Sequence, residues 1–269
     1  MGPRDAGLRR PPRGRYRCAI DVSHLKTGCR VGPPDPRNLP AARYLELSSL
    51  PTPPASWTRI AQRVTRWPMY ANDRLNDCTT AAVGHKVMAA SGWAGHLHVP
   101  GEDSVVALYW ATGTKDDGRL PNAVLNAWRR ATGELGAHKP EAYVVVDHTN
   151  AAMLRTAAYL FAGVYVCANL PVNLKQQLAA NRTTWRYVPG AGSAPGSWDG
   201  HAFVAPGYYA NGDWDIRSWA KRFRITKRWM QEYVYLAFAI LSTDELQRVN
   251  GKNPQGIDLA TLRADLQRL

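Results

Sequence analysis

The sequence contains no apolar run of the length that a membrane span requires. A transmembrane helix needs about 20 consecutive apolar residues, whereas the longest run here, Val234–Leu241, has the length of a strand. Basic residues occur at the N-terminus without an apolar segment behind them, so we predict no secretory signal. Together these absences predict a cytoplasmic chain without a membrane span.

Cysteines and metal-ligand motifs are scarce as well. The four cysteines among 269 residues are too few for a disulfide scaffold, and Cys18 and Cys29 are expected to pair only in an oxidising compartment. His96 and His98 alternate on a possible strand, but no cysteine or second histidine pair follows at the spacing of zinc ligands. Gly190-Ala191-Gly192 lacks the Lys-Ser/Thr of a phosphate-binding loop. The sequence therefore predicts neither a metal nor a cofactor.

Acidic residues are outnumbered, with 21 Asp and Glu against 34 Lys and Arg and a net charge of +13. The first 17 residues hold six arginines and one aspartate, so most of the excess lies elsewhere. This arginine-rich tail can bind polyanions without specificity. The stretch Arg217–Arg228 contains no acid and interleaves Trp219 and Phe223 with its cations, a combination that suits single-stranded nucleic acid.

The distribution of proline and apolar residues divides the chain into four parts. Residues 1–17 consist mainly of Gly, Pro and Arg, and we expect them to be disordered. Recurrent prolines over 18–56 predict an extended arm laid over a domain, with a short helix at Ala41–Ser48. The compact domain is predicted over 57–243, and 244–269 is predicted to be a helical segment packed on it.

Helical patterns dominate the first half of the domain and strand patterns the second, which favours an α+β fold. An Asn-Gly turn at 211–212 predicts a hairpin between the third and fourth strands. The expected helices are Asp77 or Cys78 to about Ser91, Asp103–Thr112, Pro121–Thr132, Ala151–Phe161, a short one from Thr226 or Lys227, Asp244–Val249 and Asp258–Leu269. The expected strands are Tyr143–Val146, Gly163–Ala168, His201–Tyr209, Trp214–Trp219, Phe223–Thr226 and Tyr233–Leu241.

One set of residues carries the elements of nucleophilic chemistry. Cys78 lies at the predicted start of a helix, where unpaired amides and the helix dipole favour the thiolate and lower the pKa of the thiol. His201, which begins a strand after Gly200, could accept the thiol proton and hold the thiolate as an ion pair. Asn72, six residues before the cysteine, could donate to an oxyanion together with the Cys78 amide.

This order of residues resembles that of the papain-like cysteine peptidases, and over 30–265 it is similar to uncharacterised papain-like proteins of actinobacteria and their phages. The motifs are Trp67-Pro68-Met69, Asn72-Asp73, Asp77-Cys78-Thr79, Gly200-His201-Ala202 and Ser218-Trp219. The resemblance implies a helical N-terminal subdomain, opened by the cysteine helix, packed against an antiparallel sheet. It also implies acyl transfer from a peptide or amide to water without a cofactor, and association with a virion if a phage encodes the chain.

The sequence departs from the family at the residue that orients the histidine. The family's asparagine falls by register on Arg217, which has no acceptor and would repel an imidazolium. Asp215 shares a strand face with position 217 and is the candidate substitute, although it is displaced by about 6–7 Å along the strand. Asp213, in the turn, is a weaker candidate. Asn72 stands where the family has glutamine.

Three functions remain open at this point. The first is a papain-like cysteine hydrolase with the dyad Cys78 and His201. The second is an inactive papain-like binding or structural module, which Arg217 motivates, and the third is a nucleic-acid-associated protein, which the charge motivates. We expect two further residues of suggestive type, His85 and Cys167, to be core side chains.

Overall fold

The computed structural model describes residues 20–33, 35, 38–45, 50–248 and 258–267. The predicted disordered tail and Cys18 lie outside the described residues. Of the helix expected at Ala41–Ser48, the described part forms a 3-10 turn at Ala41–Arg43. The extended course of the arm, by contrast, is described over most of 20–45.

The described strands begin at Pro140 or later, whereas α-helices occur on both sides of that residue. The α-helices are α1 Ile60–Arg63, α2 Cys78–Ala94, α3 Glu102–Ala111, α4 Pro121–Arg129, α5 Gly133–Ala137, α6 Ala151–Leu160, α7 Asn173–Ala179, α8 Lys227–Tyr233, α9 Thr243–Arg248 and α10 Leu259–Gln267, with 3-10 turns η1 Val22–His24 and η2 Ala41–Arg43. The strands are β1 Pro140–Val145, β2 Val164–Leu170, β3 Thr184–Trp185, β4 Asp199–Tyr208, β5 Trp214–Ser218, β6 Lys221–Ile225 and β7 Val234–Ser242. The short elements α1, α5, α7 and β3 were not expected.

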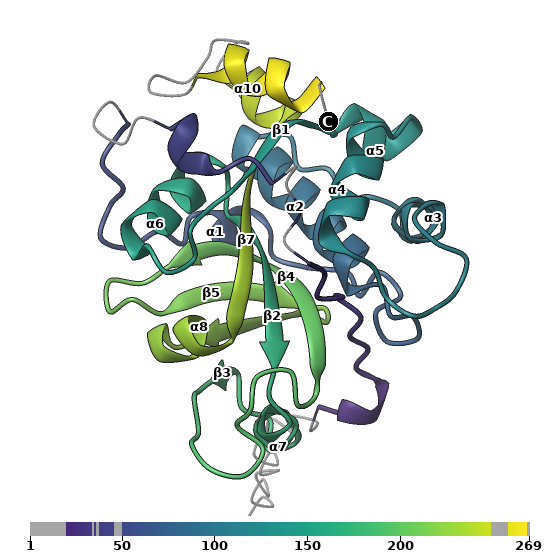
Figure 1. The fold of residues 1–269 in the computed structure, drawn as a ribbon, viewed down its shortest axis with the longest axis vertical. Coiled ribbons are helices and arrows are strands. Elements are labelled where there is room, and N and C mark those ends of the chain that lie inside the picture. The colour runs from purple at the N-terminus through teal and green to yellow at the C-terminus, as the bar shows by residue number, and fades with distance from the viewer. Residues whose placement is uncertain (1–19, 34, 36–37, 46–49, 249–257, 268–269) are drawn as a thin grey trace, which may run out of the picture.

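The described strands form one sheet in the order β1-β7-β2-β4-β5-β6-β3. Neighbouring strands run antiparallel except the short pair β3 and β6. In the view of Figure 1, helices α2 to α5 lie together to the right of β1 and β7, and α6 lies to their left. The α+β architecture, with a helical part preceding an antiparallel sheet, is confirmed.

Helix α2 is the centre of the core. Sixteen of its 17 residues are buried, because small and apolar side chains occupy all of its faces. Lys86, the cation on this helix, is fully buried and lies 2.8 Å from the Glu245 carboxylate of α9. The helix ends at Gly95 with φ +97°, one turn beyond the predicted end, as a left-handed glycine cap allows.

Two tight turns define the strands around β5. The predicted Asn-Gly hairpin between β4 and β5 is present, with Gly212 at φ +89°. Between β5 and β6 the two turn residues, Trp219 and Ala220, both have positive φ, of 46° and 55°. Two consecutive residues of this kind make the tightest hairpin connection. Strand β5 therefore ends at Ser218, and Trp219 lies in a turn instead of the predicted strand.

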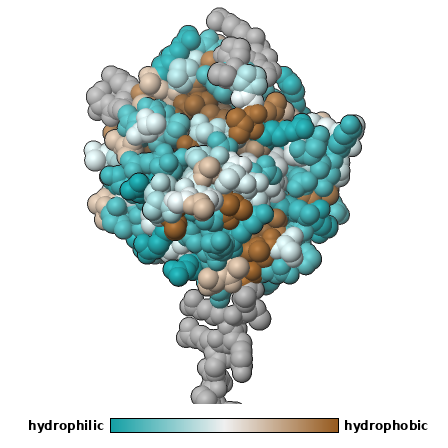
Figure 2. All heavy atoms as spheres, turned by 60° about the horizontal axis from the view of Figure 1, so that its bottom comes forward, coloured by the Kyte–Doolittle hydropathy of each residue, from teal (hydrophilic) through white to brown (hydrophobic). Residues whose placement is uncertain are grey.

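None of the helices in the described part of the chain combines the length and apolar character that crossing a bilayer takes. On the face shown in Figure 2, hydrophilic residues predominate and hydrophobic ones gather in small separate groups.

Candidate active site

Cys78 is the first residue of α2 and is 1% exposed. Its Sγ accepts a hydrogen bond from the backbone amide of Ala202, with 3.4 Å between the nitrogen and the sulfur. Ala202 belongs to β4, so the N-terminus of the central helix abuts the start of a central strand. The fold thus brings the predicted nucleophile to the residue that follows the predicted base.

His201 is fully buried at the start of β4. Its Nε2 lies 2.6 Å from the Ser218 hydroxyl oxygen, and its Nδ1 has no hydrogen-bond partner among the described residues. The Trp219 indole stacks on the imidazole, with 4.1 Å between ring centroids and 20° between planes. The ring is therefore held at Nε2 and covered on one face, and Nδ1 is the nitrogen that remains to accept a proton.

The prediction that Asp215 orients the histidine is wrong. Both carboxylate oxygens of Asp215 accept from the Arg217 guanidinium, at 2.8 and 3.0 Å, and Oδ1 also accepts from Arg222 at 2.7 Å. Because side chains alternate along a strand, Asp215 and Arg217 share the face of β5 opposite to Ser218. Ser218 contacts the imidazole instead.

Arg217 does not act as a free cation at the site. It is 1% exposed, its charge is paired with Asp215, and its guanidinium lies 5.0 Å from the Trp67 ring centroid. The weaker candidate Asp213 is likewise engaged, because it accepts from Arg224 at 2.8 Å. The expected repulsion of an imidazolium is therefore offset by the partner carboxylate.

Asn72 is buried in the loop before α2, 2% exposed. Its Nδ2 donates to the Leu75 carbonyl at 3.2 Å. A side-chain amide carries two N–H groups, and the Asn72 amide also interacts with the Asp77 carboxyl, whose pKa it lowers against the larger effect of burial. The role of Asn72 as an oxyanion donor remains a prediction.

A segment of the N-terminal arm, Lys26–Arg30, lies over this site, and we call it the strap. The amides of Gly28 and Cys29 both donate to the Gly200 carbonyl at 3.0 Å. This contact is close enough that a Cβ on Gly200 would overlap the Cys29 carbonyl oxygen. The strap therefore binds the residue directly before His201 by its backbone.

Three further contacts fix the first residues of the strap. The Lys26 amide donates to the Asn72 carbonyl at 3.1 Å, and its carbonyl accepts from Trp219 Nε1 at 2.8 Å. The Thr27 hydroxyl donates to the Asp199 carboxylate. The strap thus joins the loop before α2 to the sheet and covers the residues around His201.

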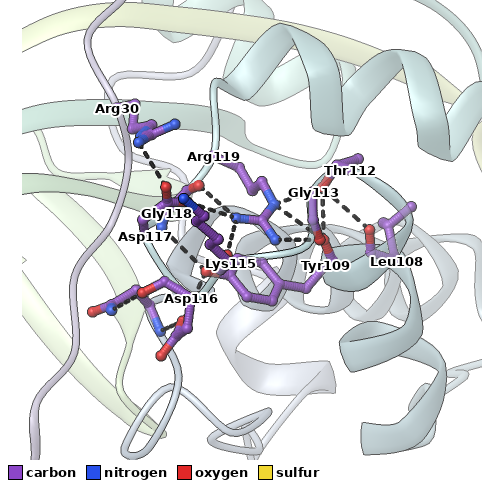
Figure 3. A network of polar contacts seen from close by, with 11 residues as sticks. Arg30, Leu108, Tyr109, Thr112, Gly113, Lys115, Asp116, Asp117, Gly118 and Arg119 are labelled. Carbon is purple, nitrogen blue, oxygen red and sulfur yellow. Dashed lines mark hydrogen bonds and ion pairs between the residues drawn. The ribbon is translucent and has the colours of Figure 1, made fainter.

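On the side of the helices, the loop between α3 and α4 binds the strap. Arg119 donates its amide to the Gly28 carbonyl at 2.8 Å and accepts from the Arg30 amide at 2.9 Å. The Arg30 guanidinium lies 2.9 Å from the Asp117 carboxylate (Figure 3). Backbone pairing on both sides makes the strap a bridge between the helical part and the sheet.

The loop that grips the strap is itself rigidly held. The Arg119 guanidinium is 4% exposed and converges on backbone oxygens of the loop and of α3, as Figure 3 shows. Its acceptors are the carbonyls of Tyr109, Gly113, Lys115 and Gly118 and the Thr112 hydroxyl. A buried cation with this many acceptors fixes one wall of the cleft.

Burial decides the charge state of the dyad. It raises the pKa of Cys78 well above its usual value, and the neighbouring Cys29 adds to the rise. It lowers the pKa of His201 to about 3, with a smaller contribution from His85. The expected lowered thiol pKa is thus wrong for the strap-covered site, because the dyad is removed from water and both groups are neutral.

Several other predictions are settled by burial and contacts. His85 and Cys167 are core side chains as expected, 2% and 0% exposed. His96 contacts the Asp244 carboxylate at 2.8 Å, and His98 lies 3.0 Å from Glu134. These histidines therefore pair with carboxylates.

The basic stretch Arg217–Arg228 is partly neutralised. Its aromatic residues Trp219 and Phe223 are 1% exposed and belong to the core. Arg217 and Arg222 pair with Asp215, and Arg224 pairs with Asp213. The interleaved aromatics are thus unavailable for stacking on bases.

Sequence reasoning missed Ser218 as the partner of His201 and Arg119 as the organiser of the cleft wall. It also missed Asp77, whose carboxyl is fully buried beside the nucleophile and whose pKa burial raises to about 8. The Ser218-Trp219 motif would have indicated this role of Ser218 if the predicted strand had ended at Ser218 instead of Trp219. No sequence signal pairs Arg119 with Gly28.

A helix-opening cysteine packed against a histidine-bearing antiparallel sheet defines the papain-like fold, and comparison with solved structures confirms that fold for this chain. Xylellain, a cysteine protease from Xylella fastidiosa, aligns with a TM-score of 0.61 and 13% identity over 81% of this chain and 96% of its own. The cysteine protease and lectin-like domains of Cwp84, a surface layer associated protein of Clostridium difficile, align with a TM-score of 0.56 and 13% identity over 83% and 57%. ProCathepsin B S9 from Trypanosoma congolense aligns with a TM-score of 0.56 and 12% identity over 83% and 88%. Neither the protein-family models nor the curated proteins gave a match.

Proposed function

We propose that the protein is a papain-like cysteine hydrolase that cleaves peptides or related amides. The observation that carries this proposal is the junction of Cys78 and His201, with Nε2 of the imidazole held by Ser218 and Nδ1 unpartnered. A core histidine would pair both ring nitrogens, as buried polar groups normally do. A buried Nδ1 without a partner, on the residue next to the one whose amide contacts the buried thiol, fits the base of a cysteine nucleophile.

The reaction follows from these positions. When the site is opened to water, the Cys78 thiol passes its proton to Nδ1 of His201, and the thiolate attacks the substrate carbonyl carbon. The imidazolium then gives that proton to the leaving amine as the C–N bond breaks, which leaves a thioester on Cys78. Water, deprotonated by His201, attacks the thioester and releases the acid and the free thiol.

Two groups serve the oxyanion in this proposal. The amide of Cys78 is in the first turn of α2, where backbone N–H groups lack helical partners. The second N–H of Asn72 Nδ2 is the other donor. Such donors stabilise the charge that develops on the carbonyl oxygen in the transition state.

Ser218 and Trp219 are positioning residues. With the hydrogen on Nε2, His201 donates to the Ser218 hydroxyl, which leaves Nδ1 as the acceptor for the thiol. Trp219 shields that hydrogen bond from water through its stacking on the ring. The strap keeps this assembly covered, so turnover requires the strap to leave the cleft.

The test uses the full chain, the variant Gly28→Ala and the double variant Gly28→Ala/Cys78→Ala. A Cβ on Gly28 would overlap the Asn76 carbonyl, and φ at this position is +113°, so Gly28→Ala should unseat the strap. Each protein is incubated with a peptide mixture, and new termini are read by mass spectrometry. Hydrolysis by Gly28→Ala that disappears with Cys78→Ala is expected.

The alternative of an inactive binding module is favoured by the neutral, covered dyad and by a serine in place of an amide at the histidine. It predicts no new termini from any of the proteins. It also predicts that the Cys78 thiol pKa stays near the ordinary ~8.5 of a free cysteine once the strap is unseated. Measuring the pH dependence of Cys78 alkylation in Gly28→Ala separates the two functions.

A further inference from the structure

The cleft under the strap carries a carboxylate on each wall. Asp199 stands on the sheet side, two residues before His201, and accepts from the Thr27 hydroxyl. Asp117 stands on the helical side and accepts from the Arg30 guanidinium at 2.9 Å. Both carboxylates therefore face the chain that occupies the cleft, and the occupant satisfies both.

The occupant is cationic. The strap Lys26–Arg30 contains a lysine and an arginine and no acidic residue. Asp117 also lies 3.3 Å from the buried Arg119 guanidinium, which holds the carboxylate in place (Figure 3). A positioned carboxylate on a fixed wall recognises a guanidinium or ammonium in a defined place.

A cavity of about 600 Å³ continues the cleft beyond the strap. The sheet contributes Asn169, Asp199 and Gly200 to its lining, the loop before β4 contributes Gly196, and the helical side contributes Leu120. The arm supplies the rest of the lining, including Arg30, so Asp199 is the ionisable lining residue that remains when the arm leaves, and the two glycines leave room beside it. A long basic side chain fits this combination of space, apolar surface and a single acid.

The acidic cleft contrasts with the rest of the molecule. The chain has a net charge of +13, which by itself would repel a cationic ligand and attract an anionic one. Selection of a basic peptide must therefore come from the two carboxylates at short range.

We propose that Asp117 and Asp199 make this cleft selective for extended peptides that carry Lys or Arg, and that the strap is an internal occupant of that kind. The substrate class this names rests on the proposed function. Binding itself does not depend on turnover, so it is tested by protection of the Cys78 thiol and not by hydrolysis.

The first experiment measures the rate of Cys78 alkylation by iodoacetamide in Gly28→Ala, by peptide mapping, with two competitor peptides. These are acetyl-Lys-Thr-Gly-Ser-Arg-amide and its acidic counterpart acetyl-Glu-Thr-Gly-Ser-Glu-amide. The basic peptide is expected to slow alkylation about fivefold more than the acidic one, the scale of a partly exposed ion pair. Adding Asp117→Asn and Asp199→Asn should abolish the difference, whereas Asp147→Asn, a carboxylate in the turn after β1 that binds Thr149, should preserve it.

The second experiment leaves the strap in its native sequence apart from one charge. Arg30→Glu places two carboxylates together and should speed Cys78 alkylation severalfold, and Asp117→Arg in the same chain should restore slow alkylation. Equal protection by both peptides, a difference that survives Asp117→Asn and Asp199→Asn, or no rescue by the charge swap would overturn the proposal. Because none of these readouts requires peptide cleavage, a protein that selects basic peptides and never hydrolyses them would refute the hydrolase alone.

Discussion

Ser218 contacts His201 from the position next to the one that the family register assigns. The placement of Cys78 at a helix start and of His201 at a strand start could be predicted, because both kinds of start are readable in sequence. The third member could not, because it depends on where β5 ends. Trp219 and Ala220 adopt positive φ, which non-glycine residues seldom do. No sequence pattern therefore predicts the turn that ends β5.

Replacing the dyad cysteine tests the nucleophile directly. In Gly28→Ala, where the strap is unseated, Cys78→Ala should remove one adduct formed by a thiol-directed electrophile, while Cys167→Ala should leave the number of adducts unchanged. The reason is that Cys167 is 0% exposed in β2 and burial raises its pKa well above the usual value. Labelling quantified by intact mass decides the point, and equal labelling of both variants contradicts the assignment.

Removing the Ser218 hydroxyl tests its positioning role. Ser218→Ala deletes one hydrogen bond to the imidazole, worth about 1 kcal/mol, so the alkylation rate of Cys78 in Gly28→Ala should fall roughly fivefold. The apparent thiol pKa should rise, because an unanchored imidazolium stabilises the thiolate less. Ser218→Asn should restore both values, since an amide oxygen can also accept from Nε2.

Asp215 supplies the contrast to Ser218. Asp215→Asn weakens a buried pair with Arg217 and should cost about 3–5 kcal/mol of unfolding free energy if the cation is left uncompensated. The pH profile of Cys78 alkylation should not move, because no contact joins Asp215 to His201. Denaturant unfolding and the alkylation profile measured together distinguish the two residues, and a shifted profile in Asp215→Asn would reinstate it as the orienting group.

At the scale of elements, the arm was predicted to be extended but its place was not. Prolines report local backbone conformation, and they carry no information on which distant segments pair with it. The strap reaches Gly200 and Arg119, both far along the chain, through backbone hydrogen bonds alone. The sequence feature that indicates such a contact is glycine, because it allows two backbones to approach closely.

Unseating the strap should expose the dyad. Gly28→Ala introduces a side chain at φ +113° against Asn76, so Cys78 alkylation should rise about tenfold or more while the fold persists. Gly133→Ala is the matched control, since Gly133 also has a positive φ, of +63°, with nothing within 4 Å of the added Cβ. A rate of alkylation that rises equally in both variants would assign the effect to backbone strain.

At the scale of the whole molecule, the fold class followed from the order of helix and strand patterns. The short helices α5 and α7 were not predicted, because one or two turns contain too few residues to show a helical period. Net charge was a poor guide to local function, because a basic chain holds two carboxylates at its cleft and pairs three arginines of its basic stretch with aspartates.

Polyanion binding should therefore depend on the N-terminal tail. Deleting residues 1–17 removes six arginines and should abolish most of the affinity for single-stranded DNA, along with its salt dependence. Arg222→Ala, which removes a cation paired with Asp215, should leave binding almost unchanged. Fluorescence anisotropy at two salt concentrations measures both, and a large loss in Arg222→Ala would support a designed nucleic-acid surface.

The stability of the whole molecule should peak near pH 6.5, because buried groups titrate in opposite senses. Burial lowers the pKa of His201 to about 3 and of His85 to about 4, so between these values and ~6.5 the unfolded chain binds two more protons and acid destabilises the fold. Burial raises the pKa of Asp77 to about 8, so from ~4 to 8 the folded chain binds one extra proton and acid stabilises it. Below pH 6.5 the two histidines outweigh the aspartate by one proton, about 1.4 kcal/mol per pH unit, and from there to pH 8, below the range in which cysteines ionise in the unfolded chain, the effect of Asp77 dominates. Melting temperatures from pH 4 to 8 should show this maximum, and Asp77→Asn should flatten its alkaline side and steepen its acid side, where the two histidines then act unopposed. A melting temperature that climbs steadily to pH 8 would mean that Asp77 is ionised inside the fold.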